Sequence, residues 1–463
     1  MTLQTRPGVP ARRSGGRGRC ATLVITCAYS FRAAVLQCVP FSRHAAGMRN
    51  AASGTWTAPS RGRLTLTAAH PFQEGLVRGS SLLLSSALVL ASSCRESPVQ
   101  PTARQASPNF SVARAYTAID LGTLGSEVSD AEGINEARQV IGASRTASNE
   151  YHGFLWDHGR MTDLTPAGGT RSNAIALNNT GQVAVFSRTA SDVPGRGFLW
   201  DHGTITDLGS LGGTGPYPYD ITTPTAINAA GQVAGGSLTM DGHLHAFVWD
   251  RGTMTDLGAL PGHAFSIVLA MNAAGQMVGE SCRVDYVYGP CHAVLWDHGT
   301  MTDLGTLSGG LTSARGIDPA GRVVGISATP DGRYAPVLWD RSGITLIAPF
   351  IYFGLIAINP RGQVIGTSQE AFLWDRGTLI DLGTLDGTQR SEAFAINPSG
   401  QVVGISRTRN GKARAFLWDR GTMIELPALG GCCGAPRAIN AAGDIVGWSE
   451  TADGEIHATL WTR

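Results

Sequence analysis

A unit of about 44 residues recurs eight times between Ala115 and Arg463, and this repetition constrains the fold more than any other feature of the chain. Its most regular marker is a Trp that ends an F-L-W-like segment, at positions 156, 200, 249, 296, 339, 374, 418 and 461. Each copy also carries a segment similar to A-I-N-x-x-G-Q-V-V-G, and most carry T-D-L-G. A period of this length is typical of the blades of a β-propeller.

Each unit predicts four short strands. The N-x-x-G sequence predicts a tight turn between the first two strands, because Asn can hydrogen-bond to its own backbone and Gly tolerates positive φ. Near-continuous apolar runs in the second and third strands indicate sheets that are covered on both faces. The 60 Gly residues and the 15% of charged residues also fit short strands and turns better than long helices. We therefore expect an all-β fold, a β-propeller of eight four-stranded blades.

The two ends of the repeat array complement each other. Residues 116–121 (YTAIDL) form a fourth strand that no third strand precedes, and residues 458–461 (ATLW) form a third strand that no fourth strand follows. Pairing of these two segments would close a ring and remove the exposed sheet edges of an open array. An open solenoid would instead need capping repeats at both ends, and the sequence offers none.

Residues 1–75 lack periodicity and contain ten Arg but a single acidic residue, Glu74. We interpret them as untranslated or as a disordered, transit-like leader. Translation would then start near Val77.

Residues 76–94 have the organisation of a secretory signal peptide. Arg78 precedes an apolar run at 82–91, and small residues follow before Cys94. The run is too short to span a bilayer; a buried apolar helix is the alternative. The A-S-S-C stretch resembles a bacterial lipobox, whose Cys is lipidated, although Ala91 stands where Leu is commonest. We expect an extracellular or cell-envelope protein, either secreted or anchored through Cys94, with residues 95–114 as a disordered tether.

The repeats at 115–463 resemble the HAF repeat family. The tripeptide at 245–247 is HAF, and those at 292–294 (HAV) and 457–459 (HAT) are close variants. The resemblance covers about three-quarters of the chain. It implies an extracellular repeat protein of unsettled function, with no catalytic residues to transfer.

Charge and motifs exclude several classes of function. From Cys94 onward the chain holds 25 basic and 34 acidic residues, a balance of −9, which argues against a nucleic-acid partner. No catalytic or phosphate-binding motif is recognisable, so we predict no cofactor and favour a non-enzyme over an enzyme. The membrane would be contacted only through Cys94, and we expect a monomer.

Residues that recur in every unit are more simply explained by structure than by function. We expect the Trp residues to pack in the core rather than to form a carbohydrate platform. The acids that follow them should cap turns, and those of T-D-L-G should accept hydrogen bonds from the following Gly-rich loop. Because Arg or Glu replaces His in several units, we predict no metal site.

The cysteines outside the leader form two pairs. Cys282 and Cys291 flank the loop between a second and a third strand, where a hairpin would bring them together as a disulfide. Cys432 and Cys433 are adjacent, and both free thiols and a disulfide between neighbours remain open.

Function is expected on one face of the ring. The loops between strands two and three and those between blades vary in length and content, and in an up-and-down blade they share a face, which we call the variable face. Its candidate ligand-binding residues are Tyr217, Tyr219, Asp220, Phe265, Tyr286, Tyr288, Tyr352 and Phe353, with His263, Arg171 and Arg390 nearby. Aromatic and charged groups of this kind suit a protein segment or a glycan, but they could equally plug the centre of the ring. The leading hypothesis is a binding module; the alternatives are a propeller-type hydrolase or lyase acting on extracellular carbohydrate, and a structural envelope protein.

Overall fold

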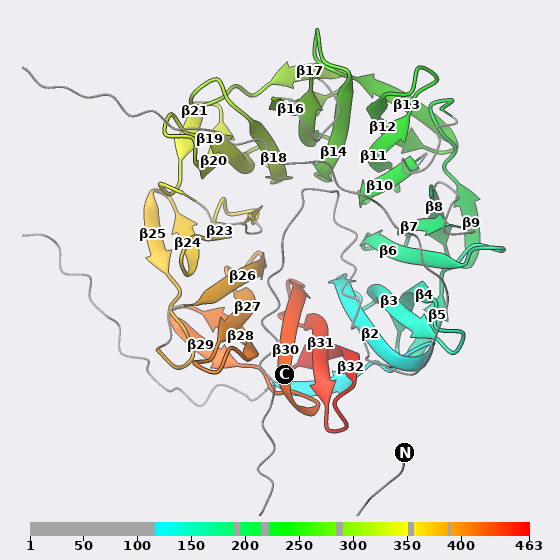
Figure 1. Cartoon of the computed structure of the whole chain (residues 1–463), viewed down its shortest axis with the longest axis vertical. Coiled ribbons are helices and arrows are strands. Elements are labelled where there is room, and N and C mark those ends of the chain that lie inside the picture. Colours follow the sequence, from blue (N-terminus) through cyan, green and yellow to red (C-terminus); the bar gives the residue numbers. More distant parts are fainter. Residues whose placement is uncertain (1–115, 189–194, 214–221, 284–289, 351–355, 388–389) are drawn as a thin grey trace, which may run out of the picture. The chain divides into compact units, whose positions relative to one another are not determined.

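Every element in the described part of the chain is a β-strand (Figure 1). The computed structural model describes residues 116–188, 195–213, 222–283, 290–350, 356–387 and 390–463. None of these residues belongs to a helix that is long and apolar enough to cross a membrane.

The strands form six four-stranded sheets and one eight-stranded sheet. The eight-stranded sheet consists of two sets of four that a short parallel contact between β2 and β32 joins. We number these four-stranded sets as blades. Blades 1 to 4 are β2 (Gly125–Ile134), β3 (Val140–Thr146), β4 (Tyr151–Asp157) and β5 (Arg160–Asp163); β6 (Arg171–Leu177), β7 (Val183–Arg188), β8 (Arg196–Asp201) and β9 (Thr204–Asp207); β10 (Thr222–Ile227), β11 (Val233–Leu238), β12 (Leu244–Asp250) and β13 (Thr253–Gly258); and β14 (Phe265–Met271), β15 (Met277–Cys282), β16 (Cys291–Asp297) and β17 (Thr300–Asp303). Blades 5 to 8 are β18 (Thr312–Ile317), β19 (Val323–Ala328), β20 (Tyr334–Asp340) and β21 (Gly343–Leu346); β22 (Ala357–Ile358), β23 (Val364–Thr367), β24 (Ala371–Asp375) and β25 (Thr378–Asp381); β26 (Ser391–Ile396), β27 (Val402–Arg407), β28 (Ala413–Asp419) and β29 (Thr422–Glu425); and β30 (Gly430–Ile439), β31 (Ile445–Thr451), β32 (Ile456–Thr462) and β1 (Thr117–Asp120).

The turn between the first two strands has the predicted chemistry. In blade 2, Oδ1 of Asn178 accepts hydrogen bonds from the backbone N–H groups of Thr180 and Gln182. Gly181 adopts a φ of +86°, which L-residues with a side chain rarely adopt. The Asn and Gly of the repeat are therefore turn-forming residues.

The turn between strands three and four is equally regular. In blade 2 both central residues have positive φ, at 47° for His202 and 95° for Gly203, as a type I′ hairpin requires. The preceding Asp201 accepts hydrogen bonds from His202 and from Gln182, which directly precedes β7. These recurrent acids thus hold the hairpin and the Asn turn together.

The hydrophobic core lies between neighbouring blades. One cluster joins Ala184 and Leu199 of blade 2 to Val233, Phe247 and Trp249 of blade 3. Equivalent clusters follow at the other blade boundaries, and several of the repeated Trp side chains are completely or almost completely buried in them. Blade-to-blade packing explains the near-continuous apolar runs of the second and third strands.

Asn side chains link the blades in a ring. The Nδ2 atom of Asn135 donates a hydrogen bond to the backbone carbonyl of Asn178 in the next blade, at 3.1 Å. Asn440 of blade 8 donates in the same way to the carbonyl of Asn135, which returns the series to blade 1. Six such bonds occur among the described residues. The Asn of the repeat is therefore both a turn residue and a contact between blades.

The N-terminal strand closes the ring, as the ends of the array predicted. β1 pairs antiparallel with β32, with Thr117 opposite Thr462 and Asp120 opposite Thr459. The hydroxyl of Tyr116 donates to the carbonyl of Gly443 in the same blade. Blade 8 is thus built from both ends of the described chain.

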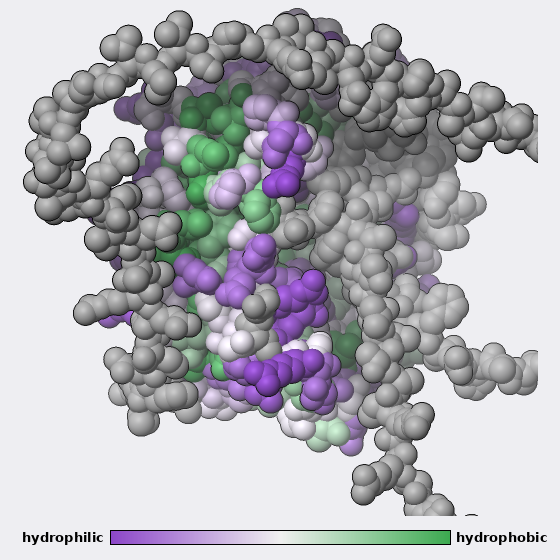
Figure 2. All heavy atoms as spheres, turned by 60° about the vertical axis from the view of Figure 1, so that its left-hand side comes forward, coloured by the Kyte–Doolittle hydropathy of each residue, from purple (hydrophilic) through white to green (hydrophobic). Residues whose placement is uncertain are grey.

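The outermost strands form the side wall of the ring. Leu346 of β21 and Leu379 of β25 are about half exposed there. Figure 2 brings this side forward and shows hydrophobic and hydrophilic surface mixed on it. The outer strands therefore present a mixed surface to solvent.

Candidate functional site

The variable face contains the ends of the second strands and the beginnings of the first and third strands. Of the eight predicted ligand-binding residues, the structure describes Phe265, which is the first residue of β14 and partly buried. The others lie outside the described residues, as does Cys94: Tyr217, Tyr219, Asp220, Tyr286, Tyr288, Tyr352 and Phe353.

Phe265 stands beside a disulfide. The strand register places Phe265 opposite Cys282, and Cys282 opposite Cys291 on the third strand of blade 4. A disulfide joins Cys282 to Cys291, with Cα atoms 4.1 Å apart. It therefore ties together the end of β15 and the beginning of β16 at the variable face.

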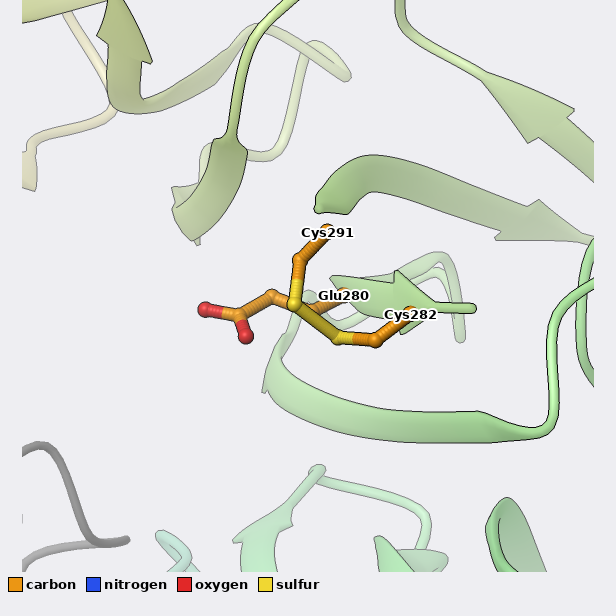
Figure 3. A group of neighbouring side chains, drawn as sticks. All are labelled: Glu280, Cys282 and Cys291. Carbon is orange, nitrogen blue, oxygen red and sulfur yellow. A yellow bond between two sulfur atoms is a disulfide. The ribbon is translucent and has the colours of Figure 1, made fainter. Parts of the chain in front are cut away.

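Glu280 lies next to this disulfide (Figure 3). Its side chain is buried, and it accepts a hydrogen bond from Ser313 of blade 5. Burial raises the pKa of Glu280, while the nearby Arg315 guanidinium opposes the rise. Although its carboxylate and the two sulfur atoms lie within 4.8 Å of one another, disulfide sulfurs are not thiolate ligands, so this group does not form a metal site.

A second cluster in blade 4 combines Ser, His and Asp. Nδ1 of His263 lies 3.1 Å from Oγ of Ser281, the ring of His263 packs edge-on against that of His292, and His292 contacts Asp303 at 2.7 Å. Burial lowers the pKa of His263, and His292 adds to this effect. The order of groups is similar to that of a catalytic triad.

Repetition shows that this order is structural. The Oγ of Ser281 accepts a hydrogen bond from the backbone N–H of Leu260, and the equivalent Ser of other blades does the same. Those equivalents bind the loop that follows the preceding blade, through Ser144, Ser237, Ser327, Ser406 and Ser449. A hydroxyl that holds the same loop in several blades, and is fully buried, is not placed as a nucleophile.

The His–acid pairs repeat in the same way. A basic residue at the start of the third strand contacts the acid of T-D-L-G on the fourth strand, in the pairs His152–Asp163, Arg196–Asp207, His245–Asp256, His292–Asp303, Arg414–Glu425 and His457–Asp120. Burial alone would raise the pKa of Asp303, but the hydrogen bonds with His292 and with the backbone of Gly305, together with the nearby imidazole charges, lower it. The acid also accepts from the Gly-rich loop, as Asp207 does from the N–H of Gly209. That predicted role of the acids is confirmed.

Blades 1 and 2 bring arginines and aromatic rings together on the variable face. The Cζ atom of Arg145 lies 5.3 Å from the ring centre of Tyr151, and that of Arg171 lies 5.8 Å from the same ring. Arg171 is the cross-strand partner of Arg188, whose guanidinium lies over Phe186. We call these five residues the arginine cluster.

The arginine cluster concentrates positive charge. Burial lowers the pKa of Arg171, and the neighbouring Arg188 adds to the effect. Guanidinium groups held over aromatic rings are restricted in the directions that their N–H donors can take. The cluster is therefore suited to a planar anionic group such as a carboxylate.

Sequence reasoning named Arg171 but missed the rest of the cluster. Arg145 is the penultimate residue of β3, Arg188 is the last residue of β7, and Tyr151 opens a third strand. Their recurrence at equivalent strand ends in adjacent repeats was the available signal. What the sequence could not supply was the contact between blades that sets Arg171 over Tyr151.

Comparisons with known proteins show a likeness to propeller-containing structures. No protein-family model matches the chain, and no curated protein matches it. Among solved structures, a prolyl endopeptidase chain is 11% identical to this chain, with a TM-score of 0.48; the match covers 72% of this chain and 54% of the endopeptidase chain. A puromycin-hydrolysing peptidase of Mycobacterium tuberculosis is 14% identical, with a TM-score of 0.43, and the match covers 68% of this chain and 56% of the peptidase. TolB from Acinetobacter baumannii is 12% identical, with a TM-score of 0.34, and the match covers 72% of this chain and 64% of TolB. This chain therefore spans less than two-thirds of each, and the likeness carries no argument about activity.

Proposed function

We propose that the protein is an extracellular binding module of the HAF repeat type, and that it binds an acidic polysaccharide on its variable face. The observation that supports this best is the arginine cluster, in which Arg145, Arg171 and Arg188 surround two aromatic rings. Uronic acid residues offer a carboxylate for the guanidinium groups and a sugar face for the rings. An acidic protein segment is the other ligand of this chemistry.

The cluster distinguishes this function from the two alternatives. A structural envelope protein needs no arginines held over aromatic rings on one face of the ring. A propeller-type hydrolase or lyase needs acids or a His–acid pair at the ring mouth, whereas the described His–acid pairs hold third and fourth strands together in several blades. Binding is therefore the better supported function.

Export belongs to the same proposal. The apolar run before Cys94 and the disulfide between Cys282 and Cys291 both suit an oxidising compartment. Intact-mass analysis of the protein from its native host should give a chain that begins at Cys94, with acyl chains if the lipobox is used. A mature chain that retains residues 1–75 would contradict export.

Affinity electrophoresis in gels that contain a polyuronate tests the ligand. We expect the full mature chain to be retarded by the polyuronate and not by a neutral glucan, and Arg171→Ala to weaken binding about tenfold or more, because a charge-assisted contact contributes about 1.5–3 kcal/mol. Arg251→Ala is the matched control, since Arg251 is highly exposed in a turn between strands three and four, on the opposite face. Equal retardation by both polymers, or no effect of Arg171→Ala, would refute the proposal; retardation only by an acidic peptide would replace the polysaccharide with a protein segment.

A further inference from the structure

Blade 8 places two neighbouring cysteines on the same side of a strand. Successive side chains of a regular β-strand point to opposite faces. The register of β30 against β31 is irregular between Gly430 and Gly434, and Gly430 has a φ of +107°. As a result the Sγ atoms of Cys432 and Cys433 meet at 2.6 Å.

A carboxylate completes this group. Oε2 of Glu450, on the facing strand, accepts a hydrogen bond from the backbone N–H of Cys432 at 2.9 Å. A Cβ atom at Gly431 would lie 2.6 Å from Cβ and Cγ of Glu450, so a glycine leaves room for this side chain. One ligand atom from each of Cys432, Cys433 and Glu450 lies within 4.8 Å of the others.

The group opens into a pocket between blades 7 and 8. The pocket has a volume of about 210 Å³, and both cysteines line it together with Lys412, Arg414 and Glu425. Cys432 is exposed and Cys433 is half-buried. A ligand bound to the two sulfur atoms would therefore remain accessible to solvent and to exchange.

Blade 1 shows that the backbone does not require cysteines here. β2 has the same irregularity, between Gly125 and Ser129, but Glu127 and Val128 occupy the positions of Cys432 and Cys433. Arg145 occupies the position of Glu450. The same strand geometry thus exists without sulfur and without the carboxylate, so neither follows from the fold.

We propose that Cys432, Cys433 and Glu450 bind a thiophilic divalent cation of the zinc and cadmium class. Two thiolates and one carboxylate supply three ligands that Zn²⁺ accepts in proteins, and the pocket leaves a fourth position for water or a small ligand. Binding releases the two thiol protons. The divalent cation, the two thiolates and the ionised carboxylate then form a complex with one net negative charge. The site is independent of the arginine cluster and of polysaccharide binding.

Cobalt(II) is the probe, because thiolate coordination gives it intense charge-transfer absorption. We expect the reduced full chain to bind one equivalent of Co²⁺ with thiolate charge-transfer bands, and Cd²⁺ to displace it. The Cys432→Ser/Cys433→Ser double variant should lose the bands. Glu450→Gln should keep two thiolate ligands but weaken Co²⁺ binding about tenfold or more.

Cys282→Ala/Cys291→Ala is the matched control, because it removes the other two described cysteines and should leave the bands unchanged. The proposal is overturned if the reduced wild-type chain shows no thiolate bands. It is also overturned if the bands survive in Cys432→Ser/Cys433→Ser, or if Glu450→Gln binds Co²⁺ as tightly as the wild type. A bond between Cys432 and Cys433 that mild reductant cannot open, measured by intact mass, would likewise refute it.

Discussion

Blades 4 and 8 each carry two cysteines, but strand geometry gives the two pairs opposite properties. Cys282 and Cys291 meet through regular cross-strand pairing, and both are buried with 0% and 2% of their area exposed. Cys432 and Cys433 meet because one strand is irregular, and they line an open pocket. Regular pairing yields a buried disulfide between two strands, whereas local irregularity yields accessible thiols at a pocket.

Blades 4 and 8 also each take part in a contact between a carboxylate and an arginine across a blade boundary. Glu280 of blade 4 lies 4.0 Å from the Arg315 guanidinium of blade 5, and Asp130 of blade 1 lies 3.1 Å from that of Arg437 of blade 8. Arg315 and Arg437 occupy the same position in their repeats. Each is the residue of its first strand at which the pairing with the second strand shifts by one. Among the described residues, contacts of this kind between a carboxylate and an arginine thus occur at the boundary of blades 4 and 5 and at that of blades 8 and 1.

The largest effect should come from Asp130. Burial raises its pKa from 3.8 to about 7, despite Arg437, and Oδ1 of Asp130 has no hydrogen-bond partner. Because the folded state binds this proton more tightly than the unfolded state, its contribution to stability is present at low pH and is lost as pH rises toward and through 7. We expect the free energy of unfolding to fall by at most about 4 kcal/mol from this group between pH 4 and 8.

Urea unfolding of wild type and Asp130→Asn at pH 5 and pH 8 measures this contribution. The variant should gain stability relative to wild type as pH rises. Glu280→Gln should change in the same direction, because burial raises the pKa of Glu280 as well. If the difference in unfolding free energy between wild type and Asp130→Asn were the same at both pH values, the pKa of Asp130 would not be raised in the folded state.

The disulfide should have the next largest effect. Cys282 and Cys291 are nine residues apart in sequence, and closing a loop of this size lowers the entropy of the unfolded chain. We expect Cys282→Ala/Cys291→Ala to lose about 2–3 kcal/mol of unfolding free energy in denaturant titrations. If the loss were no greater than on removing Cys432 and Cys433, the two cysteine pairs would not differ in their contribution to stability, and the comparison between blades 4 and 8 would fail.

The contact between blades 8 and 1, which we call the seam of the ring, should contribute less to stability. Arg138 occupies the position of the turn Gly in blade 1 with a φ of 63°, and it makes two hydrogen bonds to Asp444, which replaces the repeat Gln in blade 8. Burial would raise the pKa of Asp444, but hydrogen bonds from Arg138 and Thr462 outweigh it and lower the pKa. A lowered pKa means that this stabilisation is present above the unfolded-state pKa and is lost as pH falls through the folded-state pKa.

A double-mutant cycle with Arg138→Ala and Asp444→Ala measures the seam. We expect a coupling energy of about 1–2 kcal/mol at neutral pH, since Arg138 is half exposed, and a smaller value at pH 3. The pair Arg322 and Asp318 offers a comparison within one blade, with atoms 2.6 Å apart. A coupling that does not weaken in acid would contradict the role of the Asp444 carboxylate.

Repetition decided what could be predicted from the sequence. The turn residues, the apolar runs and the unpaired end strands each report a local rule, so strand pattern and ring closure followed from them. The arginine cluster depends on which side chains meet across a blade boundary, and the Cys432 and Cys433 site depends on a register shift near Gly430. Both are departures from the repeat, and a departure shows its partner only when the blades are packed together.

The smallest effect on stability should come from removing the exposed cysteine pair, and it tests the comparison most sharply. Without a bound metal, Cys432→Ala/Cys433→Ala should change the free energy of unfolding by less than about 0.5 kcal/mol, because Cys432 is exposed and the strand geometry exists in blade 1 without cysteine. Titration of native protein with a coloured thiol reagent should find two fewer reactive thiols in this variant than in wild type. Cys282→Ala/Cys291→Ala should leave that number unchanged, because these sulfurs are bonded and buried. A large loss of stability on removing Cys432 and Cys433 would mean that blade 8, like blade 4, uses its sulfur pair to hold the fold, and that the pocket is not open to ligands in the way its geometry indicates.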